Sequence, residues 1–362
     1  MRVISDLNTW CLSLLLGLLW WRGDQALGDG GVDVWRRAVE LVKGRVEQAC
    51  GLVMASMSNH VASAAPPLAP PTWVVECATF GVLSWLVLGC TFVCLATCVE
   101  FANRLGWLRG LELNTAALDE RGREAQASLV REAQRESLVQ WMVRPFLLSA
   151  FYAAVVRPRY GPLDAPFPSL RTALPQLFVC MLVDDTWFYW AHRVCHEVPF
   201  LYRNIHKKHH RFFRTTVWAV EFAHPLEDLF VNTTATMLGG VVQGAHPGVI
   251  VLYAALKLYQ STEAHCGYAV KFPLSIGSLI DSMDASPAHH YHHAAVTSNY
   301  GGWFMFWDWV CGTDAKYRAH ITVNKGAELP AYAQARRPYA NDAKWPSIML
   351  VVKETHAQPK LD

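Results

Sequence analysis

The stretch 192-HRVCHEVPFLYRNIHKKHH-210, with 289-HHYHH-293 further along the chain, says most about this protein. Residues three and four apart lie on the same face of a helix, so histidines at these spacings can share one target. Each group of histidines, here called a box, is therefore expected to be helical and to point two or three imidazoles at one place. The three boxes are His192 and His196; His206, His209 and His210; and His289, His292 and His293.

Eight convergent imidazoles predict a metal site. They would repel one another when protonated near their usual pKa of about 6.5, and metal ligation avoids this because the ligand is the neutral ring. A zinc ion takes three or four protein ligands, so eight histidines predict two metal ions. Imidazole suits iron, copper, nickel and zinc alike, which leaves the element open. A metal pair that faces lipid favours redox chemistry on O2 over hydrolysis, for which no nucleophile motif is seen.

The composition is typical of a membrane protein. Hydrophobic residues make up 52% of the chain and charged residues only 17%, whereas about 25% charged is usual for soluble domains. Aromatic residues reach 12%, with 15 Trp, which fits side chains anchored at a membrane interface. The net charge of +2, without a basic stripe, predicts no nucleic-acid partner.

Several uncharged segments predict membrane-embedded helices. Cys77–Val99 is long enough to span a bilayer, and Pro145–Val156 and Thr172–Val183 are shorter apolar segments. Leu229–Leu256 is interrupted by Gly and Pro at Gly244–Gly248, which predicts a helical hairpin with a tight turn. We therefore expect an all-α integral membrane protein with four or five membrane-embedded helices.

The chain divides into four predicted regions. Trp10–Trp21 is a candidate signal anchor, Ala65–Pro71 is a Pro-rich linker, and Gly110–Gln140 is expected to be a solvated amphipathic helix. The regions are an N-terminal extension (1–71), N-terminal membrane helices with the charged helix (72–171), the histidine-rich domain (172–318) and a C-terminal tail (319–362).

The distribution of basic residues predicts the orientation. A hairpin returns the chain to the side on which it entered, so all three boxes are expected at one membrane face, in a helical cap that holds the di-metal site. Cytoplasmic segments are rich in Lys and Arg, which places this cap in the cytosol. The basic residues that follow the apolar segment are Arg193, Arg203, Lys207, Lys208, Arg211 and Arg214.

Two further groups of residues near the predicted spans call for interpretation. Asp184 and Asp185 lie near membrane depth, where carboxylates are costly and usually functional. We predict that Asp185 is a hydrogen-bond partner of a box histidine, the alternative being an interfacial carboxylate. Cys90, Cys94 and Cys98 are expected to be reduced packing residues of a span, the alternative being a soft-metal site.

From about Leu174 to Arg318 the chain resembles the fatty acid hydroxylase/sterol desaturase superfamily of membrane di-iron enzymes. The three boxes in this order carry the resemblance, together with the lead-in 185-DTWFYWAHR-193. The segments 221-EFAHPLE-227, 263-EAHCGY-268 and 307-WDWVCGTD-314 resemble the 4-methylsterol oxidase (C-4 methylsterol monooxygenase) branch. The resemblance implies that His224 and His265 supplement the box histidines, giving ten ligands for two iron ions.

The resemblance also implies a reaction. Enzymes of this branch oxidise the C-4 methyl group of 4-methylsterols with O2, in the endoplasmic reticulum membrane. Electrons come from NAD(P)H through a reductase and cytochrome b5, so the chain needs no nicotinamide or flavin site of its own. Substrate would enter from the bilayer past aromatics such as Trp187, Phe188 and Tyr189, which interfacial anchoring explains equally well.

Two departures from the branch, and several alternatives, remain at this point. His290 stands where the branch has an acid that could orient a ligand imidazole, and Cys266 replaces the usual Ser. The same chemistry on another lipid would make the protein a sphingoid-base or fatty-acid hydroxylase, or a sterol C-5 desaturase. A catalytically silent lipid-binding membrane protein is the alternative from another class. The remaining histidines, expected in loops or at the surface, are His60, His246, His320 and His356.

Overall fold

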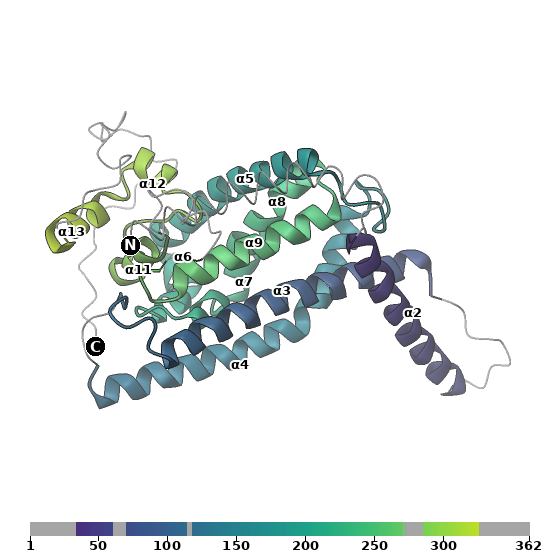
Figure 1. Ribbon diagram of the computed structural model, residues 1–362, viewed down its shortest axis with the longest axis horizontal. Coiled ribbons are helices and arrows are strands. Elements are labelled where there is room, and N and C mark those ends of the chain that lie inside the picture. Colours follow the sequence, from purple (N-terminus) through teal and green to yellow (C-terminus); the bar gives the residue numbers. More distant parts are fainter. Residues whose placement is uncertain (1–33, 61–69, 114–117, 271, 273–284, 326–362) are drawn as a thin grey trace.

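A computed structural model describes residues 34–60, 70–113, 118–270, 272 and 285–325 (Figure 1). These residues are helical apart from turns, loops and one isolated bridge between Glu112 and Tyr268. The predicted all-α class is therefore confirmed for this part of the chain. The candidate signal anchor, most of the Pro-rich linker and most of the C-terminal tail lie outside the described residues.

Two long helices lie side by side along one edge of the molecule (Figure 1). The first, α3 (Thr72–Arg104), contains the predicted span Cys77–Val99. The second, α4 (Glu120–Phe151), continues through one π-helical turn, η1 (Tyr152–Val156). A Cβ atom on Gly81 of α3 would lie 2.4 Å from the carbonyl oxygen of Pro145, so glycine permits this close approach.

The second long helix corrects one prediction. The charged segment and the apolar segment Pro145–Val156, predicted as separate elements, belong to one continuous helix. Pro145 removes one backbone N–H, which alone does not end a helix that packs along a partner. The Ser149 hydroxyl donates to the Pro145 carbonyl at 2.8 Å, so this carbonyl has a hydrogen-bond partner.

The predicted helical hairpin is confirmed. Helix α8 (Thr234–Gln243) ends at Gly244, whose φ of +69° suits glycine, and α9 (Pro247–His265) begins three residues later. The His246 ring accepts a hydrogen bond from the Gly248 N–H at 3.0 Å and so caps α9. The hairpin packs against α5 (Leu170–Glu197), which carries the first box at its C-terminal end.

Shorter elements, two of which carry histidine boxes, gather at one end of the two long helices (Figure 1). There, η2 holds the second box and α11 holds the third. At the other end, α2 (Val34–His60) packs against α3. The short elements are α6 (Pro199–Asn204), η2 (His206–Arg211), η3 (Val217–Glu221), α7 (Pro225–Glu227), η4 (Asp228–Thr233), α11 (Ala285–Ala295), α12 (Phe306–Cys311) and α13 (Ala315–Lys325).

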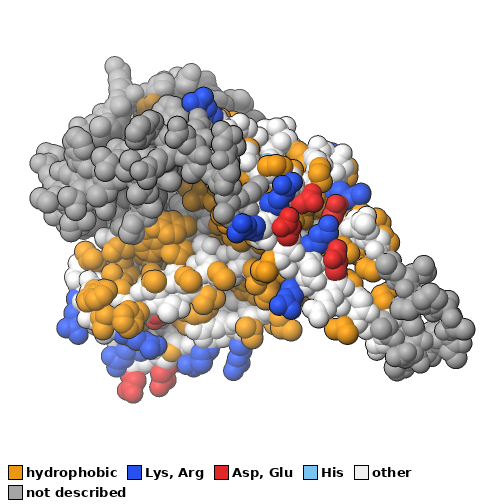
Figure 2. Space-filling model, turned by 45° about the vertical axis from the view of Figure 1, so that its right-hand side comes forward, with side chains coloured by type: hydrophobic (Ala, Val, Ile, Leu, Met, Phe, Trp, Pro, Cys, Tyr) orange, Lys and Arg blue, Asp and Glu red, His pale blue; other side chains and the backbone are white. Residues whose placement is uncertain are grey.

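Within the described residues, only α3 and the helix Glu120–Val156 are long and apolar enough to cross a membrane. Their outward faces carry large apolar side chains, such as Phe146, which is 74% exposed. Figure 2 shows hydrophobic side chains over a broad area, with most of the Lys, Arg, Asp and Glu side chains on either side of it. Contiguous exposed apolar surface of this kind is typical of contact with lipid. Further membrane-embedded helices, for a total of four or five, stay a prediction.

The three cysteines of α3 do not pack as predicted. Cys90, Cys94 and Cys98 are free thiols, but they lie on the exposed face of α3 rather than between helices. Their spacing of four residues keeps them on one face, and this face is the one turned away from α4 and α9.

Candidate metal centre

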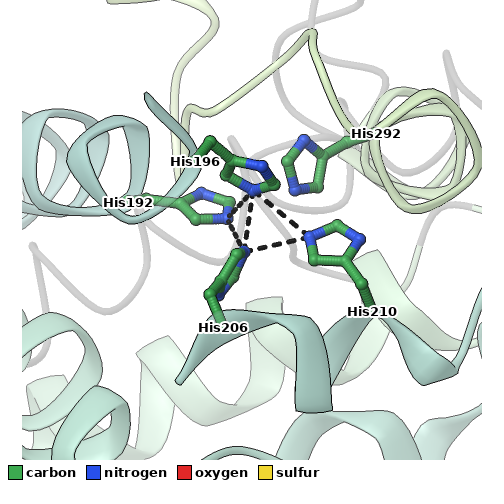
Figure 3. A group of neighbouring side chains, drawn as sticks. All are labelled: His192, His196, His206, His210 and His292. Carbon is green, nitrogen blue, oxygen red and sulfur yellow. Dashed lines mark hydrogen bonds between the residues drawn. The ribbon is translucent and has the colours of Figure 1, made fainter. Parts of the chain in front are cut away.

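The structure brings nine of the ten predicted ligands together in two groups. Within each group the ring nitrogens lie within 4.8 Å of one another. Figure 3 shows the rings of the first group pointing at a common centre. The predicted convergence of the three boxes is thus confirmed. The first histidine group consists of His192, His196, His206, His210 and His292, and the second of His209, His265, His289 and His293.

Single boxes contribute to both groups. In η2, His206 and His210 face the first group while His209, between them, faces the second. In α11, His289 and His293 are four residues apart and share the face that meets the second group. The two groups therefore share η2 and α11 and are adjacent, while α5 contributes only to the first and α9 only to the second.

The outward ring nitrogens fix the tautomer of several ligands. A carbonyl oxygen only accepts hydrogen bonds, so a ring nitrogen that contacts one must carry the proton. The other nitrogen of that ring then presents a lone pair, which is the form that binds a metal. The Nδ1–H groups donate from His192 to Tyr300 O (2.9 Å), from His209 to Phe222 O (3.1 Å), from His265 to Ser261 O (2.8 Å) and from His292 to Ser298 O (2.7 Å).

Glu227 completes this pattern for His206. Its Oε1 lies 2.7 Å from His206 Nδ1, and both side chains are buried. Burial raises the pKa of Glu227 to about 7 and lowers the pKa of His206 to about 3. Burial thus keeps the imidazole neutral, and the ring can donate Nδ1–H to the carboxylate while Nε2 faces the other histidines.

The facing nitrogens fit a bound cation. His192 Nε2 lies 3.1 Å from His206 Nε2, and His209 Nε2 lies 3.4 Å from His265 Nε2. Since all four rings carry their proton on Nδ1, neither pair can share a hydrogen bond, and two lone pairs at this distance repel each other. Metal–imidazole bonds of about 2.0–2.1 Å place neighbouring ligand nitrogens roughly 3 Å apart. The residues present therefore fit two metal ions.

Four box histidines on the short elements η2 and α11 are also kept neutral by their surroundings. Burial first, and neighbouring imidazoles second, lower the pKa of each of these rings well below its usual value. Neutral rings are ready to bind a metal without losing a proton. These four are His210, His289, His292 and His293.

His224, the tenth predicted ligand, belongs to neither group. It is half-buried at the start of α7, and its Nδ1 accepts a hydrogen bond from the Leu226 N–H at 3.2 Å. Its role as a ligand stays a prediction.

The structure corrects the role predicted for Asp185. Its Oδ1 accepts hydrogen bonds from the backbone N–H groups of Trp303 and Phe304, both at 2.9 Å, and it contacts no box histidine among the described residues. The reason is that the loop before α12 folds back onto α5. Asp185 therefore holds the loop that also supplies the Tyr300 carbonyl to His192.

Asp308 holds the same loop from its other side. Its two carboxylate oxygens accept from Tyr300 N (2.8 Å) and Gly301 N (2.7 Å). Burial raises the pKa of Asp308 to about 6. Two buried carboxylates, Asp185 and Asp308, thus position the backbone that orients a first-group histidine.

His290 is turned away from both groups. Its Nδ1 lies 2.9 Å from the hydroxyl of Thr215, and burial lowers its pKa to about 4. It therefore stays neutral near Arg214, and it does not take the place of the acid that the related branch has here.

The charged half of α4 holds η2 in place. Arg211 makes a two-pronged ion pair with Glu132, with both contacts at 2.5–2.6 Å, and Lys208 pairs with Glu136. Gln126 donates to the backbone of Arg214. The predicted solvated helix therefore also supports the second box, although exposed ion pairs of this kind contribute at most about 1 kcal/mol each.

A pocket opens beside the second histidine group. His265 and His289 line it, and so do apolar side chains such as Phe188 and Trp303. The empty space among these residues is about 540 Å³, open solvent at the mouth included. No member of the first group lines this pocket. A lipid bound there would lie next to the second group only.

Glu227 was missed by the sequence-based prediction of site residues. It stands in the segment 221-EFAHPLE-227, three residues after His224. A carboxylate this close to a candidate ligand was the signal, but only the fold shows that it serves His206, 21 residues earlier.

Comparisons with known proteins agree with the predicted family resemblance. Residues 177–313 match the family model described as fatty acid hydroxylase, so the predicted resemblance is confirmed. The chain is 33% identical over 167 residues to methylsterol monooxygenase 2-2 of Arabidopsis thaliana, covering 45% of this chain and 61% of that protein. It is also 33% identical to C-4 methylsterol oxidase erg25 of Schizosaccharomyces pombe, over 42% of this chain and 52% of that protein.

Another similar protein has a different name. Very-long-chain aldehyde decarbonylase GL1-11 of Oryza sativa is 33% identical over 156 residues, covering 42% of this chain and 57% of that protein. The chain thus spans between 52% and 61% of the length of these curated relatives. No solved structure matches it.

Proposed function

We propose that this protein, whose residues 177–313 match the fatty acid hydroxylase family, is an integral membrane di-iron oxygenase that oxidises a lipid. The most specific form of the proposal is oxidation of the C-4 methyl group of 4-methylsterols in sterol biosynthesis. The observation that carries it is the pair of buried histidine groups, whose Nε2 lone pairs face each other without a shared proton.

The proposed reaction assigns distinct tasks to the metal ions and to the protein. Two bound iron ions would supply the O2 activation that amino-acid side chains cannot perform. Each oxidation inserts one oxygen atom of O2 into a C–H bond and yields one water, using two electrons and two protons. The electrons would come from NAD(P)H through a reductase and cytochrome b5, as the resemblance implies.

The side chains described above would hold and shield this centre. Nine histidines supply neutral nitrogen ligands, and Glu227 and the Tyr300 carbonyl keep protons on the outward nitrogens of two of them. The aromatic walls of the pocket, Phe188 and Trp303, would exclude water from the oxidised carbon.

The location follows from the helices and the basic residues. Helix α3 and the helix Glu120–Val156 would cross the membrane of the endoplasmic reticulum. The boxes, followed by a cluster of Lys and Arg, would lie at its cytosolic face. From there a soluble electron carrier domain can reach the centre, and the substrate can enter from the bilayer.

Lipid profiling of a null strain tests the proposed function. Loss of the protein should lead to accumulation of 4-methylsterols, which the wild type should reverse and His292→Ala should not. The purified wild type should contain about two iron ions per chain. One zinc ion per chain, with no O2 consumption in the presence of a 4-methylsterol and reductant, would instead support a silent lipid-binding protein.

A second candidate function follows from the aldehyde decarbonylase relatives, which match at the same identity as the sterol enzymes. The same centre would then act on a long straight-chain aldehyde. Normal 4-methylsterols with altered long-chain aldehydes and hydrocarbons in the null strain would favour this function. Altered ceramides with normal sterols would favour a sphingoid-base hydroxylase.

A further inference from the structure

The polar groups of the pocket beside the second histidine group are not all engaged by the fold. Gln260 donates to the Gly302 carbonyl at 2.8 Å, and Asp308 accepts from the Tyr300 and Gly301 N–H groups. These two side chains therefore serve the loop. Two other polar side chains that line the pocket, Lys257 and Asn299, keep hydrogen-bonding atoms to spare.

Lys257 is a buried cation in the middle of α9, with 7% of its surface exposed. Its Nζ donates to Asp184 Oδ1 at 2.7 Å, and the structure shows no second acceptor for it among the described residues. The rings of Phe188 and Trp303 lie 4.7 Å and 5.4 Å from Nζ, which stabilises the charge but offers no oxygen acceptor. An ammonium group has three donors, so two remain.

Asn299 is a buried amide with one unused polar atom. It is 3% exposed and lies 2.6 Å from the Ser298 hydroxyl, whose single proton is donated to the Thr313 carbonyl at 2.7 Å, so the Asn299 amide N–H donates to the Ser298 oxygen. The other amide atom, the oxygen, then has no hydrogen-bond partner within the described part of the chain. Buried polar groups are nearly always satisfied, so an unpaired amide that lines a pocket indicates a ligand atom that completes it.

The spare groups select the chemistry of the ligand. Lys257 offers donors and the Asn299 oxygen is an acceptor, while the carboxylate in the same pocket, Asp308, already accepts backbone hydrogen bonds. The missing partner is therefore a hydroxyl group on an otherwise apolar molecule, because a hydroxyl can accept from Lys257 and donate to Asn299. A plain hydrocarbon would leave both groups unpaired, which is costly in a buried site.

We propose that Lys257 and Asn299 form a subsite that binds an oxygen atom of the lipid substrate and so positions the neighbouring carbon at the second histidine group. The inference rests on the proposed function and names the feature of the substrate that is recognised. In a 4-methylsterol the hydroxyl-bearing carbon, C-3, is bonded directly to C-4. An anchor on that hydroxyl would hold the C-4 substituents beside His265 and His289.

Equilibrium binding to the purified, iron-loaded protein in detergent tests the subsite without turnover. The two probes are 4,4-dimethylcholestan-3β-ol and its 3-deoxy counterpart, 4,4-dimethylcholestane. Binding of each is measured by the quenching of tryptophan fluorescence. The wild type should bind the alcohol roughly tenfold more tightly or better, the ratio expected for a hydrogen bond to a charged donor. This comparison needs no variant.

Two variants then assign the preference to residues. Asn299→Leu keeps the approximate size but removes the acceptor oxygen, and the double variant Lys257→Met with Asp184→Asn removes both charges together. Each should lower the preference for the alcohol, the double variant to within about twofold. Met305→Leu, which changes an apolar wall of the same pocket, should change both affinities and keep their ratio.

The outcomes separate this inference from the proposed function. Equal binding of both probes to the wild type would overturn the subsite while leaving a sterol enzyme in place. An unchanged ratio in both variants, with two iron ions retained, would also overturn it. Failure of the wild type to bind either probe would contradict the proposed sterol substrate and the subsite together.

Discussion

Replacing Glu227 with Gln should selectively weaken one of the two metal sites. Glu227 Oε1 lies 2.7 Å from His206 Nδ1, and His206 belongs to the first histidine group. Glutamine keeps the shape and an acceptor oxygen but removes the negative charge, so a charge-assisted hydrogen bond becomes a neutral one. The difference is about 1–1.5 kcal/mol, or roughly a tenfold loss of metal affinity. Complete removal in Glu227→Ala should approach the hundredfold loss typical of such partners.

Competition with a chelator measures this effect. The protein, loaded with iron, is equilibrated with increasing concentrations of chelator, and the iron that remains on each chain is counted. In the wild type both ions should resist removal, whereas in Glu227→Gln one of the two should leave at about tenfold lower chelator activity. The second ion should be lost last, because the Glu227 hydrogen bond goes to His206 of the first group and to no member of the second.

Glu221→Gln provides a matched control. Glu221 is another buried carboxylate, 5% exposed, but it pairs with Arg144 at 2.8 Å and not with a histidine. This variant should lower the stability of the fold while both ions stay bound as in the wild type. If the two variants lost iron in parallel, or if Glu227→Gln kept both ions like the wild type, the assigned role of Glu227 would be refuted.

The remaining predictions concern the outer rings, the loop and pH. His290→Ala should keep both metal ions, whereas His292→Ala should lose the ion of the first group, as metal analysis of the purified variants would show. Asp185→Ala should lower the free energy of unfolding by roughly 2–4 kcal/mol, because it leaves two buried N–H groups of the 303–304 loop unpaired, and denaturation in detergent would measure this. The metal-free protein should lose stability as the pH falls below about 6.5, because the unfolded chain binds protons there and buried His206, with a pKa of about 3, does not. The loss is about 1.4 kcal/mol per pH unit for each such ring. Glu227, whose pKa is raised to about 7, offsets one ring between pH 7 and about 4.5, and Asp308, whose pKa is raised to about 6, offsets another between pH 6 and about 3.8. Stability independent of pH from 7 to 5 would contradict the predicted sign.

The features predicted correctly from the sequence are local. Histidines four apart in α5 and α11 share a face because helix geometry alone dictates it, and the hairpin turn follows from Gly244 and Pro247. The position of the first long span follows equally from an uninterrupted apolar run. None of these predictions needs information about distant parts of the chain.

The features that were missed depend on long-range packing. Adjacent His209 and His210 enter different groups: His210 meets histidines of α5 and α11, whereas His209 meets histidines of α9 and α11. Asp185 binds a loop 118 residues later, which no spacing rule connects to it. The continuous helix through Pro145 likewise depends on packing along α3, because the sequence marks only a break.

The two histidine groups are alike in ligand type but unequal in their surroundings. The first is held from outside by Glu227 and by the loop that Asp308 fixes, and none of its members reaches the pocket. The second places His265 and His289 in the pocket wall. A C–H bond can be oxidised only where the substrate carbon approaches the centre, so under the proposed function that contact is made at the second group. A variant such as Glu227→Gln should then reduce turnover through metal loss without changing sterol affinity, whereas pocket variants should change affinity with both ions in place.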